Sequence, residues 1–122
     1  MNKFQILVVE DDVAVRNLIT TTLKAHNYRF ITATNGEGAV MEAASHNPDI
    51  ILLDLGLPDL DGVDVIKKIR TWSNTPIIVI SSIIDKKHRL DILQTGVEYF
   101  IKSPIDVSSF SINLYLVLSS YK

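Results

Sequence analysis

Short, wholly apolar segments separated by longer amphipathic stretches restrict the fold of this chain more than any other feature. The clearest is Ile50-Ile51-Leu52-Leu53, a run that leaves no polar face for solvent. Such a strand has to be covered on both sides, which is typical of parallel sheets with helices on each face. The expected strands are Gln5 to Val9, Arg29 to Ala33, Ile50 to Leu53, Ile77 to Ile80 and Tyr99 to Lys102.

Two of the intervening stretches have the spacing of amphipathic helices. They run from Val13 to Ala25 and from Gly62 to Thr71, and their apolar residues recur every three or four positions. Asn35-Gly36 and Asn47-Pro48 predict turns, and the GxG of Asn35 to Gly38 lacks the third glycine of a dinucleotide site. The pattern predicts an α/β protein with a five-stranded parallel sheet, doubly wound as in (βα)5 flavodoxin-like folds.

Length and charge exclude several classes of function. The 122 residues fit one domain, so residues 1–122 are expected to fold as a single unit. A net charge of -2 provides no basic face for direct nucleic-acid binding. No stretch reaches the roughly 18 apolar residues of a membrane span, and the N-terminus turns acidic too early for a signal peptide. A cytoplasmic protein without membrane contact is therefore expected.

Acidic residues follow two of the expected strands. The first strand runs into Glu10-Asp11-Asp12, and the third ends at Asp54. In such sheets ligands bind beyond the carboxyl ends of the strands, where the strand order reverses. Carboxylates forced together need a cation, and oxygen ligands suit Mg²⁺. A solvated acidic turn explains Glu10-Asp11-Asp12 alone equally well, but Asp54 favours a metal site.

Three segments, LVVEDD, DIILLDLGLPDLDG and PIIVISS, follow one another in an order and spacing that resemble response-regulator receiver domains. The resemblance covers nearly all of the chain. The segment DLGLPDLDGVDVIKKIRTWSNTPIIVISS further resembles receivers of winged-helix transcriptional regulators, most closely those of the Kdp potassium-uptake operon. It implies the receiver fold and a regulatory, phosphorylatable domain of two-component signalling, not an enzyme.

The resemblance also implies roles for the acids. Asp54 takes the place of the aspartate that accepts a phosphoryl group from a phosphohistidine of a sensor histidine kinase. Mg²⁺ would be held by Asp11, Asp54 and the carbonyl of Gly56, with Glu10 acting through water. Asp12 is expected to face away and cap the first helix.

The same resemblance identifies a switch and a departure from the family pattern. Ser81 takes the place of the switch hydroxyl, and Phe100 that of the switch aromatic. The family's lysine stands directly before the proline that follows the fifth strand, but here the order is Lys102-Ser103-Pro104. Ser103 thus replaces that lysine, and Lys102 is expected to point away from the site unless a bulge turns it back. A raised pKa for at least one acid and a weaker response follow from the loss of this cation.

The expected partners are a sensor histidine kinase, a C-terminal DNA-binding output domain and a second copy of the chain. The subfamily dimerises through charged residues of helix four, strand five and helix five. Arg89 and Asp106 fit that pattern, but Tyr99 and Asn113 stand where an acid and a base are expected.

Other functions remain open at this point. A pseudo-receiver, which keeps the fold but acts without phosphorylation, is favoured by Ser103. A phosphohydrolase of the haloacid dehalogenase kind needs an acid at the position of Gly56, and a flavin phosphate would be repelled by the acids. Asp59 and Asp61 are interpreted as surface acids at the N-terminus of the helix that begins near Gly62.

Overall fold

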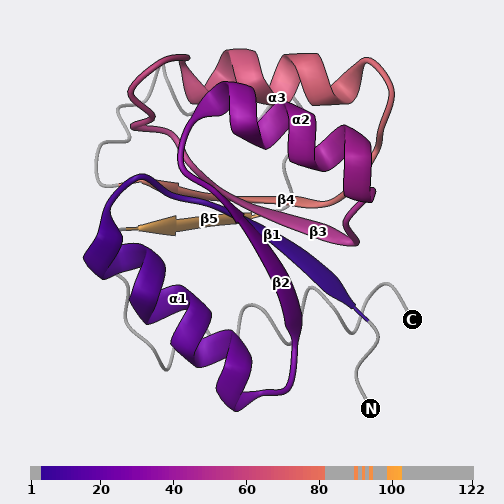
Figure 1. Ribbon diagram of the computed structural model, residues 1–122. Coiled ribbons are helices and arrows are strands. Elements are labelled where there is room, and N and C mark those ends of the chain that lie inside the picture. The colour runs from indigo at the N-terminus through magenta and orange to yellow at the C-terminus, as the bar shows by residue number, and fades with distance from the viewer. Residues whose placement is uncertain (1–3, 82–89, 91, 93, 95–98, 103–122) are drawn as a thin grey trace.

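The computed structural model describes residues 4–81, 90, 92, 94 and 99–102, which form a parallel sheet with helices on both faces (Figure 1). The predicted α/β class is therefore confirmed. The strands are β1 (Gln5–Val9), β2 (Arg29–Ala33), β3 (Ile50–Asp54), β4 (Ile77–Ser81) and β5 (Tyr99–Lys102). The helices are α1 (Val13–Ala25), α2 (Gly36–His46) and α3 (Gly62–Arg70).

The predicted boundaries agree closely with these elements. β3 and β4 each extend one residue beyond the prediction, to Asp54 and Ser81, and α3 ends one residue earlier, at Arg70. No helix in the described part of the chain is both long enough and apolar enough to cross a membrane.

The strand order is β2-β1-β3-β4-β5, with every neighbouring pair parallel. The chain passes from β1 outward to β2 and then returns to β3 on the other side of β1. Val9, at the end of β1, is paired with Ala33 on one side and Leu53 on the other. The strand order thus reverses between β1 and β3, and in sheets of this kind ligands bind in the crevice beyond the carboxyl ends of such strands.

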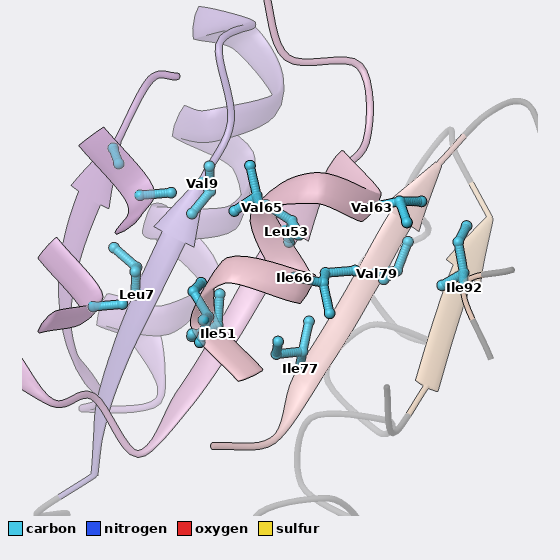
Figure 2. Close-up of a cluster of buried hydrophobic side chains, with 14 residues drawn as sticks. Leu7, Val9, Ile51, Leu53, Val63, Val65, Ile66, Ile77, Val79 and Ile92 are labelled. Carbon is cyan, nitrogen blue, oxygen red and sulfur yellow. The ribbon is translucent and has the colours of Figure 1, made fainter. Parts of the chain in front are cut away.

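Successive residues of the strands point into two separate core layers. Ile6 and Val8 pack with α1 on one face of the sheet, whereas Leu7 and Val9 pack under α2 and α3 on the other. Figure 2 shows this second layer, in which β-strand residues meet the underside of α3. Its fully buried α3 members are Val65, Ile66 and Ile69. Because both faces are covered, the inner strands β1, β3 and β4 have almost no solvent-facing residues, which explains their apolar runs. The edge strand β2 differs, since Arg29 and Thr32 are exposed.

Aspartates begin two of the helices. Asp12 Oδ1 accepts a hydrogen bond of 3.0 Å from the backbone N–H of Val15 at the start of α1. Asp61 Oδ1 accepts one of 2.9 Å from the N–H of Val63 at the start of α3. Each carboxylate satisfies a backbone donor that has no partner within its helix. The predicted capping role of Asp12 is confirmed.

The prediction of a turn at Asn35-Gly36 was wrong, because these residues begin α2. Asn35 is the N-cap, and its side chain accepts a 2.7 Å hydrogen bond from the N–H of Gly38. Position 36 has no room for a side chain, because a Cβ there would lie 2.8 Å from Leu60 Cβ and 2.9 Å from Val65 Cγ2. The helix start therefore packs directly against the segment that joins β3 to α3.

Several predictions concern residues outside the described part of the chain. These are the replacement of the family lysine by Ser103 and the charged pattern at Arg89, Asp106 and Asn113.

Candidate functional site

The predicted acids meet at the crevice between β1 and β3. Glu10 follows β1 directly, and its N–H donates a 3.0 Å hydrogen bond to the carbonyl of Ala33 at the end of β2. Asp11 is the next residue, and Asp54 is the last residue of β3. One carboxylate oxygen from each of the three acids lies within 4.8 Å of the others. Sheet topology thus brings together residues that are more than 40 positions apart in the sequence.

The three acids differ in their exposure to solvent. Glu10 is buried, with 5% of its surface accessible, whereas Asp54 is half-buried and Asp11 is exposed. The site is therefore closed on the side of Glu10 and open on the side of Asp11. A small cation could enter from solvent and reach all three carboxylates.

Glu10 is the most perturbed group of the site. Burial, followed by a hydrogen bond to Asp54 and the negative charges of Asp54 and Asp11, raises the pKa of Glu10 from 4.5 to about 9. Glu10 Oε2 has no hydrogen-bond partner among the described residues. A buried carboxyl oxygen without a partner is costly, so this oxygen is available for a cation or its water ligands. Burial is the largest cause of this raised pKa. The rise expected from the loss of the family's lysine depends on Ser103, which lies outside the described residues.

The loop after β3 shapes the open side of the site. Gly56 is exposed, and its N–H donates a 3.1 Å hydrogen bond to Asp54 Oδ1. A Cβ at Gly56 would lie 3.7 Å from Asp54 Oδ2, an ordinary van der Waals contact. The backbone N–H of Gly56 therefore orients the carboxylate of Asp54 at the start of the loop.

Arg16, which the motifs did not single out, supports the acidic turn. Arg16 Nη1 donates to the backbone carbonyl of Glu10 at 3.0 Å and more weakly to that of Asp11 at 3.5 Å. The guanidinium thus ties α1 to the backbone of two of the site acids. The available signal was its position, one helical turn after the capping residue Asp12.

Asp59 also has a role that its sequence position did not reveal. The sequence pattern predicted that Asp59 acts at the N-terminus of α3. Its carboxylate instead binds the start of α2. Asp59 Oδ1 accepts from the N–H of Gly36 at 2.6 Å, and Oδ2 accepts from the N–H of Glu37 at 3.0 Å. These two bonds, with that from Gly36 the larger effect, lower the pKa of Asp59. Asp61 does act at α3, as expected.

The remaining predicted residues lie on β4 and β5. Ser81 is the last residue of β4, and its Cα is paired with that of Lys102 at the end of β5. Phe100 of β5 is paired with Val79 of β4. Asp54 of β3 is paired with Ile80 on the opposite side of β4. The backbone therefore brings Ser81 and Lys102 to the same edge of the sheet as Asp54.

Comparison with known proteins identifies the family. Residues 6–113 match the family described as response regulator receiver domain. The chain belongs to this family. The transcriptional regulatory protein KdpE of Mycobacterium tuberculosis is 35% identical over 105 residues, which are 86% of this chain and 46% of the relative. The KDP operon transcriptional regulatory protein KdpE of Escherichia coli is 34% identical over 113 residues, 93% of this chain and 50% of the relative.

Solved structures agree with this assignment. The BeF3-activated N-terminal receiver domain of Klebsiella pneumoniae RstA superimposes with a TM-score of 0.85 at 28% identity, covering 92% of this chain and 96% of that one. A two-component response regulator from Clostridium difficile has the same fold, with a TM-score of 0.91 at 24% identity, covering 96% and 97% of the two chains. The receiver spans about half the length of the curated relatives it matches.

Proposed function

We propose that this receiver accepts a phosphoryl group on Asp54 from a phosphohistidine of a sensor histidine kinase. The observation that carries the proposal is the convergence of Glu10, Asp11 and Asp54 at the reversal of strand order, with one oxygen from each within 4.8 Å of the others. Three carboxylates this close together lower the stability of the fold, because their mutual repulsion is unfavourable. In a receiver, metal-assisted phosphoryl transfer gives a reason for them to be there.

The proposed step is a displacement at phosphorus. A carboxylate oxygen of Asp54 forms a bond to phosphorus, the bond from phosphorus to the histidine nitrogen breaks, and the electron pair returns to the imidazole. The protein contributes position and charge neutralisation, since little covalent chemistry is left to it. The Gly56 N–H, bonded to Asp54 Oδ1, holds the nucleophile in a fixed orientation.

The donor set fits Mg²⁺, which receiver domains bind at an acidic site. Asp11, Asp54 and the carbonyl of Gly56 would hold it directly, and Glu10 would do so through a water molecule. The unpartnered oxygen of Glu10 is suited to that water. When bound, the ion neutralises the carboxylates and the phosphoryl oxygens. Arg16 then keeps the turn of Glu10 and Asp11 in place through its backbone hydrogen bonds.

Phosphorylation would be transmitted through Ser81 and Phe100. A phosphoryl group offers three strong acceptor oxygens, so the Ser81 hydroxyl is drawn toward it and Phe100 follows inward. The domain thus acts as a regulator of an output and not as an enzyme with a substrate of its own. The KdpE relatives are named as transcriptional regulatory proteins. With a C-terminal DNA-binding domain, the output of this receiver would be transcription, and helix four, strand five and helix five of the family pattern would form the dimer.

A pseudo-receiver is the second candidate, because Ser103 replaces the family's lysine. Without an ammonium group at that position, phosphorylation would depend more strongly on Mg²⁺ and be slower. In the extreme case the domain would bind its partner without any phosphorylation. Lys102 restores the site only if its backbone bulges.

One experiment separates the two candidates. The protein is incubated with acetyl phosphate, with Mg²⁺ or with a chelator, and its intact mass is measured, with Asp54→Asn as the control. A Mg²⁺-dependent adduct of one phosphoryl group that is absent from Asp54→Asn supports the phospho-accepting receiver. Absence of the adduct, together with failure to bind beryllofluoride, refutes it and favours the pseudo-receiver.

A further inference from the structure

The loop between β3 and α3 is fastened to α2 by Asp59. Its two carboxylate oxygens accept the first two helical N–H groups of α2, from Gly36 at 2.6 Å and Glu37 at 3.0 Å. Both donors are left free by the helix itself, and the N-terminal end of the helix attracts negative charge. Asp59 belongs to neither helix, so these bonds connect two separate parts of the chain.

Packing makes the same connection rigid. A Cβ at Gly36 would lie 2.8 Å from Leu60 Cβ, so the start of α2 and the residue after Asp59 are already in the closest contact that a glycine allows. The two ends of the loop also contact each other, since a Cβ at Gly62 would lie 2.8 Å from Leu55 Cα. The loop is thus held at both ends, and Gly56 lies within it.

We propose that Asp59 is a positioning residue for the metal site: by anchoring the loop to α2, it sets the distance between Gly56 and Asp54 and hence the affinity for Mg²⁺. The inference rests on the proposed function, because the carbonyl of Gly56 matters only if it is a ligand. The hydrogen bond of 3.1 Å from the Gly56 N–H to Asp54 Oδ1 connects the loop that Asp59 holds to the nucleophilic carboxylate.

Two simpler roles for Asp59 make different predictions. If its carboxylate only caps α2, its loss would loosen the helix start and leave Mg²⁺ binding unchanged. If it acts only by its charge, any exposed acid nearby would have the same effect, which 0.15 M salt would largely screen. Partners that orient metal ligands typically change affinity 10- to 100-fold when removed, so the positioning role is distinguishable from both.

The test uses Asp59→Asn, which keeps the shape but loses the second acceptor and the charge. Gly36→Ala disturbs the same connection without changing the charge. The control is Asp64→Asn, which removes an equal charge from an exposed position on α3. Mg²⁺ affinity is measured at 0.15 M salt by titration of backbone amide signals, and amide hydrogen exchange is measured at Gly36, Glu37 and Gly56 without metal.

We expect Asp59→Asn and Gly36→Ala to weaken Mg²⁺ binding about tenfold and to speed exchange at Gly56, with less than a twofold effect from Asp64→Asn. If exchange rises only at Gly36 and Glu37 while Mg²⁺ affinity stays within twofold, Asp59 is a cap and the proposal is wrong. Equal losses in Asp59→Asn and Asp64→Asn refute it as well. If the wild-type protein itself binds no Mg²⁺, both the proposed function and this inference are wrong. That result differs from the two above, in which the wild type binds Mg²⁺ and only the inference is wrong.

Discussion

Replacing Glu10 by glutamine should stabilise the metal-free protein at neutral pH. The pKa of Glu10 rises from 4.5 to about 9 because the carboxyl is buried and faces Asp54 and Asp11. A folded-state pKa above the unfolded one means that unfolding releases a proton between these two values. Stability from this group is therefore fully present below about pH 4.5 and is lost as the pH rises toward 9.

The size of the effect follows from the same values. One pKa unit corresponds to about 1.4 kcal/mol, and pH 7 lies about 2.5 units above 4.5, the pKa without burial. Glu10 should therefore lower the free energy of unfolding by up to about 3 kcal/mol between pH 4.5 and pH 7. Glutamine cannot ionise, has nearly the same shape and can still donate a hydrogen bond to Asp54. Glu10→Gln is thus expected to be the more stable protein at pH 7, with a smaller gain from added Mg²⁺.

The assay is urea unfolding of both proteins in chelator from pH 5 to pH 9, repeated with Mg²⁺. The control is Glu37→Gln, which removes the same charge from an exposed position on α2. In chelator, the difference between wild type and Glu10→Gln should grow by about 1.4 kcal/mol per pH unit. Parallel pH profiles for the two proteins would show that Glu10 is not held in its protonated form, and the reasoning would be refuted.

Two further predictions concern Asp12 and the pair of Lys102 and Ser103. Asp12→Ala should remove the cap of α1 and lower the free energy of unfolding by about 1 kcal/mol, with Mg²⁺ affinity unchanged; a loss of affinity in the titration above would contradict its assignment as a cap. Ser103→Lys should speed phosphorylation by acetyl phosphate, whereas Lys102→Ala should have little effect on the mass-detected adduct. An inactive Lys102→Ala would instead mean that Lys102 itself serves the phosphoryl group.

The strands and the acidic site could be predicted because their causes lie in short stretches of sequence. A short apolar run such as Ile50 to Leu53 is typical of a strand covered on both faces, and parallel strands bring their carboxyl ends to one edge. Glu10 and Asp54 therefore had to be near each other once the strand order was known. What the pattern could not supply was the difference in burial between Glu10 and Asp11, which depends on how the crevice closes.

The start of α2 was missed because the requirement for a glycine at position 36 comes from residues distant in the sequence. Asn35-Gly36 is typical of a turn, and nothing nearby in the sequence indicates that Gly36 has to accommodate Leu60 at close range. The bonds of Asp59 have the same origin, since its partners lie 22 and 23 residues away. Residues that connect elements distant in sequence carry no local signature.

Two of these connecting residues, Arg16 and Asp59, each hold a different half of the site. Arg16 fixes the backbone of Glu10 and Asp11 from α1, on one face of the sheet. Asp59 fixes the loop of Gly56 from α2, on the other face. The negative charges of Asp54 and Asp11 repel each other and oppose the ionisation of Glu10, so without such supports the acids would move apart or draw in water. Holding each half from a different helix keeps the carboxylates close enough for a single cation, and it makes the spacing between the halves the property on which metal affinity depends.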